Sequence, residues 1–83
     1  MNAEGIEIIK NHCKIGDHLC ISFLNDEDGG EYSGNVIDMT KSYVQLKHSQ
    51  ELDFFETLSY PATMKIDWST IYWFHNITTG FAR

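Results

Sequence analysis

Apolar and polar residues alternate along five short stretches of this chain, and each such stretch predicts a β-strand. In the first stretch Leu19, Ile21 and Phe23 point to one face, and small or polar residues point to the other. Turn-forming residues such as those at 25–30 separate the stretches. The pattern predicts strands at 18–24, 31–39, 43–48, 62–68 and 71–77.

The second predicted strand contains a break in its alternation. Tyr32 and Val36 fall in one register, Ile37 and Met39 fall in the other, and Gly34 lies near the change. Such a break indicates a sharp bend or a β-bulge, as found where a barrel turns a corner. We therefore expect a strongly bent antiparallel barrel.

Before the first strand, apolar residues recur at helical spacing. Ile6, Ile9 and Cys13 are three and four residues apart, so they share one face of a helix. Asn2 is placed to cap its start, and Gly16 to end it or to turn the chain. The sequence therefore predicts a mainly β fold in one domain over 1–83, with a helix in 1–14, a five-stranded barrel in 17–77 and a tail in 78–83.

The sequence does not decide what covers the outside of this barrel, and two apolar segments bear on the question. Residues 49–60 suit either a strand or a lid, and Pro61 argues against a central strand there. The strand at 71–77 begins with apolar residues on both of its faces. Its outer face is therefore covered either by the chain itself or by a partner.

The chain is acidic, with 12 acidic and 6 basic side chains and a net charge of −6. Contacts to phosphate depend on Lys and Arg, so direct binding of nucleic acid is not expected. A protein partner with a basic surface is favoured instead. The candidate partner-binding residues are the acidic Glu4, Glu7, Asp17, Asp26, Glu27 and Asp28 and the aromatic Tyr72, Trp73 and Phe74.

Segments that would direct the chain to a membrane are not recognisable. No stretch approaches the ~20 apolar residues of a membrane helix, and the first residues lack the basic and apolar regions of a signal peptide. We therefore expect a cytoplasmic protein without a membrane partner, in which Cys13 and Cys20 stay reduced.

Catalytic and metal-binding alternatives have weaker support. Zinc-ligand atoms occur in His12, Cys13, His18 and Cys20, but their spacing matches no familiar zinc site. His18 and Cys20 share a strand face, so a metal between them stays an open alternative.

The residue types of a hydrolase triad also occur, in Asp67, Ser69 and His75, but Ser69 lies in no Gly-x-Ser-x-Gly turn. We expect neither enzymatic activity nor a cofactor.

Parts of the chain resemble the Sm-like barrels. Residues 16–23, 30–39 and 44–46 follow the order of the first Sm motif, and 66–71 resembles the strand-turn-strand of the second. The resemblance implies a short helix followed by five bent strands, an arrangement that is also SH3-like. It does not extend to the loop after Asp38, where Sm proteins usually carry an asparagine.

The chain is also similar to the Rof family of modulators of Rho-dependent transcription termination. Residues 6–8 with His12 resemble the helix of that family, and 19–23 with Gly29 and Gly30 resemble its first hairpin. Residues 65–67 with Ile71 resemble its late strand-turn. The resemblance implies a regulator that covers the basic RNA-binding face of Rho.

Two functions therefore stay open: a module that docks on a basic partner such as Rho, or a homo-oligomeric Sm-like ring with a weak RNA-binding or scaffolding role. A ring would pair its copies edge to edge through the fourth and fifth strands.

Overall fold

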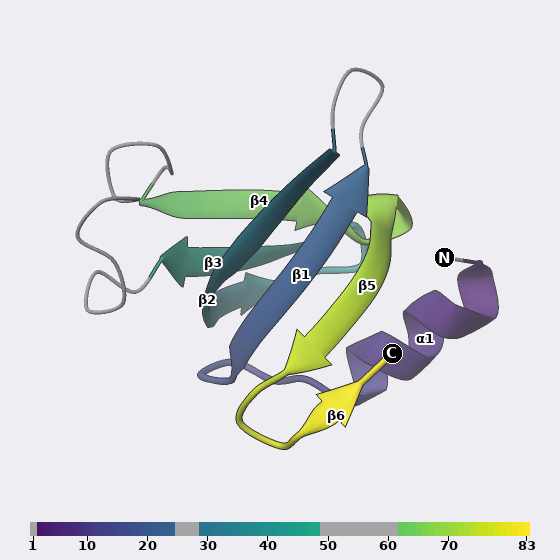
Figure 1. Ribbon diagram of the computed structural model, residues 1–83, viewed down its shortest axis with the longest axis horizontal. Coiled ribbons are helices and arrows are strands. Elements are labelled where there is room, and N and C mark those ends of the chain that lie inside the picture. The colour runs from purple at the N-terminus through teal and green to yellow at the C-terminus, as the bar shows by residue number, and fades with distance from the viewer. Residues whose placement is uncertain (1, 25–28, 49–61) are drawn as a thin grey trace.

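The computed structural model describes residues 2–24, 29–48 and 62–83, and it shows a mainly β protein with one N-terminal α-helix (Figure 1). The helix is α1 (Ala3–Asn11), and the strands are β1 (His18–Leu24), β2 (Gly29–Met39), β3 (Tyr43–His48), β4 (Thr63–Asp67), β5 (Ile71–Asn76) and β6 (Phe81–Ala82). A 3₁₀ turn, Trp68–Thr70, joins β4 to β5. Within these residues no helix has the length and apolar character that crossing a membrane requires.

Most of the elements lie where the alternation predicted them. β1 and β3 have the predicted bounds, and β2, β4 and β5 differ from the prediction by at most two residues at either end. The helix ends at Asn11, before Cys13. The segment 49–60 and most of the turn at 25–30 lie outside the described residues.

The strands form one antiparallel sheet in the order β4-β3-β2-β1-β5-β6. Its edge strands, β4 and β6, are not hydrogen bonded to each other, so the sheet is open. The closed, five-stranded barrel expected from the sequence is therefore not confirmed. The additional strand, β6, lies in the segment 78–83 that was predicted as a tail.

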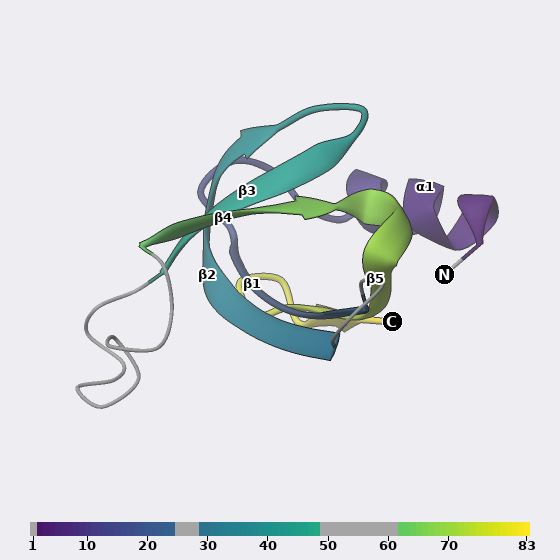
Figure 2. The same cartoon turned by 90° about the horizontal axis from the view of Figure 1, so that it is seen from above.

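Strand β2 is curved, and it lies between β3 and β1 in the sheet (Figure 2). Gly34 of β2 is paired with a residue on each neighbouring strand: Leu19 of β1 on one side and His48 of β3 on the other. A side chain at position 34 would collide with the backbone carbonyl of Lys47, so this close approach requires glycine. The irregularity in pairing falls at Ile37, which explains the change of apolar register.

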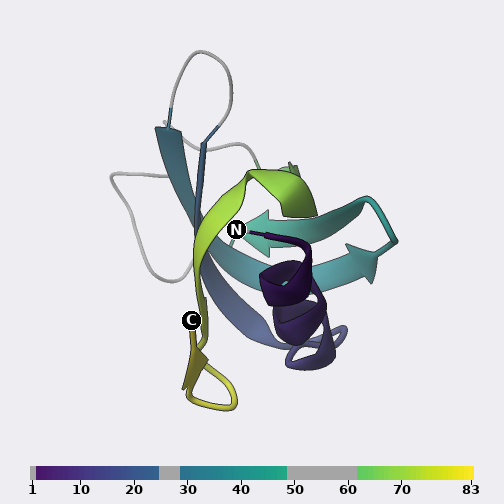
Figure 3. The same ribbon diagram turned by 90° about the vertical axis from the view of Figure 1, so that its right-hand side faces the viewer.

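The core lies on the concave side of the sheet, and α1 contributes to it. Asn2 caps the helix, since its side-chain oxygen accepts a hydrogen bond from Gly5 N at 2.8 Å. Figure 3 shows the helix between β5 and the turn that joins β2 to β3. The buried apolar side chains are Ile9, Leu19, Ile21, Tyr32, Val36, Val44, Leu46, Ile66, Trp68, Ile71 and Phe74.

Candidate functional site

The acidic residues near the N-terminus do not form one surface. Glu4 and Glu7 are exposed on α1, and the Glu7 carboxylate lies 3.9 Å from the Lys10 ammonium. Asp17, in contrast, is only 4% exposed. Asp17 is therefore not available at the surface for a partner. This finding corrects the prediction from the sequence, which counted Asp17 among the partner-binding residues.

Asp17 belongs to a buried polar network. Its Oδ2 accepts hydrogen bonds from the Asn76 side-chain amide at 2.9 Å and from the Lys14 backbone N–H at 3.1 Å. Asn76 is fully buried, and its Nδ2 also donates to the His12 carbonyl at 2.7 Å. The network joins the loop after α1 to the end of β5, so Asp17 has a structural role.

The net charge is carried by segments of the sequence outside the described residues. The described residues hold all six basic side chains and six acidic ones, so they are formally neutral. The excess negative charges belong to the segments between β1 and β2 and between β3 and β4: Asp26, Glu27, Asp28, Glu51, Asp53 and Glu56. The first three of these are predicted partner contacts, and the structure does not describe them.

Strand β5 carries the exposed aromatic side chains. Its register against β1 shifts at Phe23, which leaves Tyr72 without an opposite residue. As a result, Tyr72 and Trp73 both stay outside the core and are 54% and 38% exposed. Phe74 is fully buried, so the surface role predicted for it does not fit the structure. The bulge explains why both faces of this strand looked apolar.

The side chains of β2, β1 and β5 that point away from the core form a continuous surface, here called the outer face. Cross-strand pairing places Glu31 opposite Ser22, and Ser22 opposite Trp73. Neighbouring strands are ~4.8 Å apart, so Glu31 and Trp73 begin about 10 Å from each other with only a small hydroxyl side chain between them. The outer face comprises Ser22, Leu24, Cys20, Glu31, Ser33, Trp73 and His75.

Two contacts position side chains on the outer face. The ring of His75 lies edge-on to that of Trp73, with centroids 5.8 Å apart. The Cys20 thiol donates to Glu31 Oε1 at 3.5 Å. Burial raises the pKa of the Cys20 thiol, and the hydrogen bond to Glu31 and its negative charge raise it further. The outer face therefore presents an indole ring and a carboxylate, and its thiol stays neutral.

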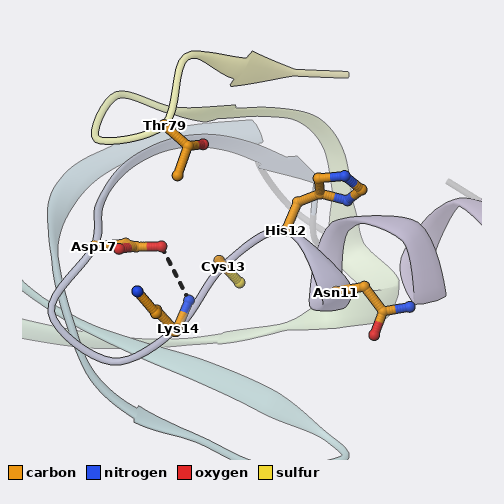
Figure 4. Close-up of a pocket in the computed structure, with 6 residues that line it drawn as sticks. All are labelled: Asn11, His12, Cys13, Lys14, Asp17 and Thr79. Atoms are coloured by element: carbon orange, nitrogen blue, oxygen red, sulfur yellow. Dashed lines mark hydrogen bonds between the residues drawn. The ribbon is translucent and has the colours of Figure 1, made fainter.

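A pocket of about 290 Å³ lies between the end of α1 and the turn that leads to β6, lined by Asn11, His12, Cys13, Lys14, Asp17 and Thr79 (Figure 4). Burial, together with the nearby Asp17, raises the pKa of the Cys13 thiol to about 11. His12 stacks on Phe81, with ring centroids 3.9 Å apart. Because the thiol is protonated and Asp17 is engaged, this pocket supports the fold and offers no activated nucleophile.

A second pocket, of about 330 Å³, lies between α1 and the neighbouring turns. Lys10 Nζ donates to the Lys41 carbonyl at 3.1 Å and lies 5.7 Å from the centre of the Trp68 ring. The Trp68 indole donates to the Thr40 carbonyl at 2.9 Å. These contacts fix the helix against the sheet.

The described residues do not arrange the candidate metal ligands or the candidate triad residues as a site. Among the described residues, no group of three or more His, Cys, Asp or Glu side chains is arranged to hold a metal ion. The hydroxyl of Ser69 donates to Asp67 Oδ1 at 2.9 Å, as part of the cap of the 3₁₀ turn, whereas His75 contacts Trp73.

The chain matches no known protein family, no characterised relative and no solved structure. Two residues of the outer face were not among the partner contacts predicted from the sequence: Glu31, and Leu24, which is 57% exposed. The strand alternation was the available signal, because it places both side chains on the face opposite to Ile21.

Proposed function

We propose that this chain is a non-catalytic, cytoplasmic binding module that docks on the basic surface of a nucleic-acid-binding protein and blocks its RNA site. The observation that carries the proposal is the pair of exposed aromatic side chains, Tyr72 and Trp73, on the same sheet as Glu31. Large aromatic side chains commonly anchor protein interfaces, and opposite charge attracts the correct partner. The resemblance to the Rof family makes Rho the first partner to test.

The fold that we infer is a variant of the Sm-like barrel. It is supported by a helix that precedes the strands, by β1 pairing with both β2 and β5, and by a curved β2 that pairs with β1 and β3. In this interpretation β6 is an addition at the open edge of β5.

Direct binding of RNA is the less favourable function. The six basic side chains lie in the described part of the chain, together with an equal number of acidic ones. Lys10 is held by the Lys41 carbonyl, and Lys65 lies 5.0 Å from the centre of the Tyr43 ring. Such dispersed cations are a poor match for a polyanion.

Binding to purified Rho across a salt series tests the proposal. Affinity is expected to fall steeply as salt rises from about 50 to about 300 mM, because the Debye length shortens over this range. RNA is expected to compete. Affinity that does not change with salt, or no binding to Rho and to other basic nucleic-acid-binding proteins, refutes the proposed function.

Two charge-matched variants locate the interaction. One combines Asp26→Asn, Glu27→Gln and Asp28→Asn, a segment that begins two residues after the outer-face residue Leu24. The other combines Glu51→Gln, Asp53→Asn and Glu56→Gln. Both remove three negative charges. The first is expected to weaken binding by about tenfold, and the second by clearly less. Equal losses contradict docking near the outer face.

The ring-forming alternative requires two free strand edges. β4 is an edge strand with no other described strand on its far side. β5 is covered, because Phe74 and Arg83 exchange two backbone hydrogen bonds, of 2.9 and 2.8 Å. Pairing of β4 with β5 of another copy would displace β6, so light scattering is expected to show a monomer. A discrete hexamer or heptamer would favour the ring.

A further inference from the structure

One row of the outer face combines three side chains of different chemistry. Glu31 supplies an exposed carboxylate, Ser22 lies next to it, and Trp73 supplies an indole that is 38% exposed. The Ser22 side chain is too small to block a ligand from contacting both Glu31 and Trp73. The edge-on contact with His75 limits how the indole ring turns.

We propose that this row receives an arginine side chain of the partner, with the guanidinium over the Trp73 ring and its N–H groups directed at Glu31. The inference rests on the proposed function and adds the residue type that the site selects. A guanidinium is planar, stacks on aromatic rings and donates two parallel hydrogen bonds to a carboxylate. A lysine ammonium has no planar face and no pair of parallel N–H donors, so we expect it to bind this row more weakly.

The net charge of the chain favours a cation over an apolar ligand at this row. The chain carries a net charge of −6, and Asp26, Glu27 and Asp28 belong to the segment that links β1 to β2. The Cys20 thiol beside Glu31 contributes no competing positive charge. The titratable neighbours with basic nitrogen atoms are His18, 3.1 Å from Ser33 Oγ, and His75 beside the indole. The described residues of the outer face include no lysine or arginine, so no such cation of this surface competes with an incoming guanidinium.

Octa-arginine and octa-lysine peptides, which carry the same charge, separate this inference from general attraction. Titration calorimetry with the whole chain at one salt concentration is expected to give at least about threefold tighter binding of octa-arginine. The fluorescence of Trp73 should respond to octa-arginine, whereas Trp68 is 2% exposed and should contribute a constant signal.

Three variants sharpen the test. Trp73→Leu and Glu31→Gln are expected to abolish the preference for arginine while keeping salt-dependent binding of both peptides. Glu4→Gln removes the same charge at an exposed position of α1 and should keep the preference.

Each outcome separates the two proposals. Equal affinity for the two peptides, or a preference that survives both Trp73→Leu and Glu31→Gln, overturns the arginine site and leaves docking on a basic partner standing. Absence of binding to either peptide counts against both proposals.

Discussion

Replacing Asp17 by alanine is expected to destabilise the protein without changing the way it binds a partner. The sequence grouped this residue with the acidic docking residues, but the structure buries its carboxylate between Lys14 N and the Asn76 amide. Loss of the carboxylate leaves both donors without that acceptor. The Asn76 side-chain amide keeps its hydrogen bond to the His12 carbonyl, so it loses only one of these two acceptors.

The size of the effect follows from the kind of hydrogen bond. A bond to a charged group contributes about 1.5–3 kcal/mol. Lys14 is an exposed residue, and its hydrogen bond to Asp17 is only partly buried, so its amide can recover part of the loss by binding water. We therefore expect a total of about 2–4 kcal/mol. A domain of this size has a free energy of unfolding of about 4–12 kcal/mol. The corresponding fall in Tm is about 10–20 °C.

Urea and thermal unfolding, followed by circular dichroism, measure this difference. Asp17→Asn keeps one acceptor oxygen and is expected to cost about half as much. Glu7→Ala, at an exposed position of α1, should change the free energy of unfolding by no more than about 0.5 kcal/mol. A loss below about 1 kcal/mol for Asp17→Ala would show that the network is not important for the fold. Weakened binding by a folded Asp17→Ala protein would restore the surface role.

Three further changes test other parts of the structure. Gly34→Ala forces a side chain against the Lys47 carbonyl and is expected to cost about 1–3 kcal/mol in urea unfolding; an unchanged midpoint would contradict the close approach. Deletion of 80–83 uncovers the edge of β5, so light scattering should detect self-association; a monomer of unchanged stability would contradict the role of β6. The Cys13 thiol binds its proton more tightly in the folded state, because its pKa is about 11 instead of 9.0. Stability should therefore fall as pH rises from about 9 to about 11, and Cys13→Ala should reduce this fall in pH-dependent unfolding; an identical slope in the variant would refute it.

Local signals account for the parts of the fold that the sequence predicted well. In β1 and β3, apolar residues alternate without interruption and turn residues bound each strand, so the bounds and the inward faces agree with the structure. The spacing of Ile6 and Ile9 similarly placed the helix against the core.

Features that depend on distant residues were not predictable in this way. Asp17 looks like a surface acid because its partner, Asn76, lies 59 residues further along the chain. Phe74 looked exposed because a single-residue bulge at Tyr72 shifts which side chains face inward. β6 is two residues long, and a turn with Gly80 at a φ of 83° precedes it, so alternation had nothing to detect.

The two tryptophan side chains allow the most direct test of docking at the outer face. The Trp68 indole N–H is bonded to the Thr40 carbonyl inside the structure, whereas the Trp73 ring is partly exposed. Titration of the isotope-labelled chain with octa-arginine, followed by NMR, should shift the Trp73 indole signal and the amides of Ser22 and Glu31. The Trp68 indole signal should stay in place. Shifts confined to Trp68 and the amides of α1, with an unmoved Trp73 signal, would contradict the account.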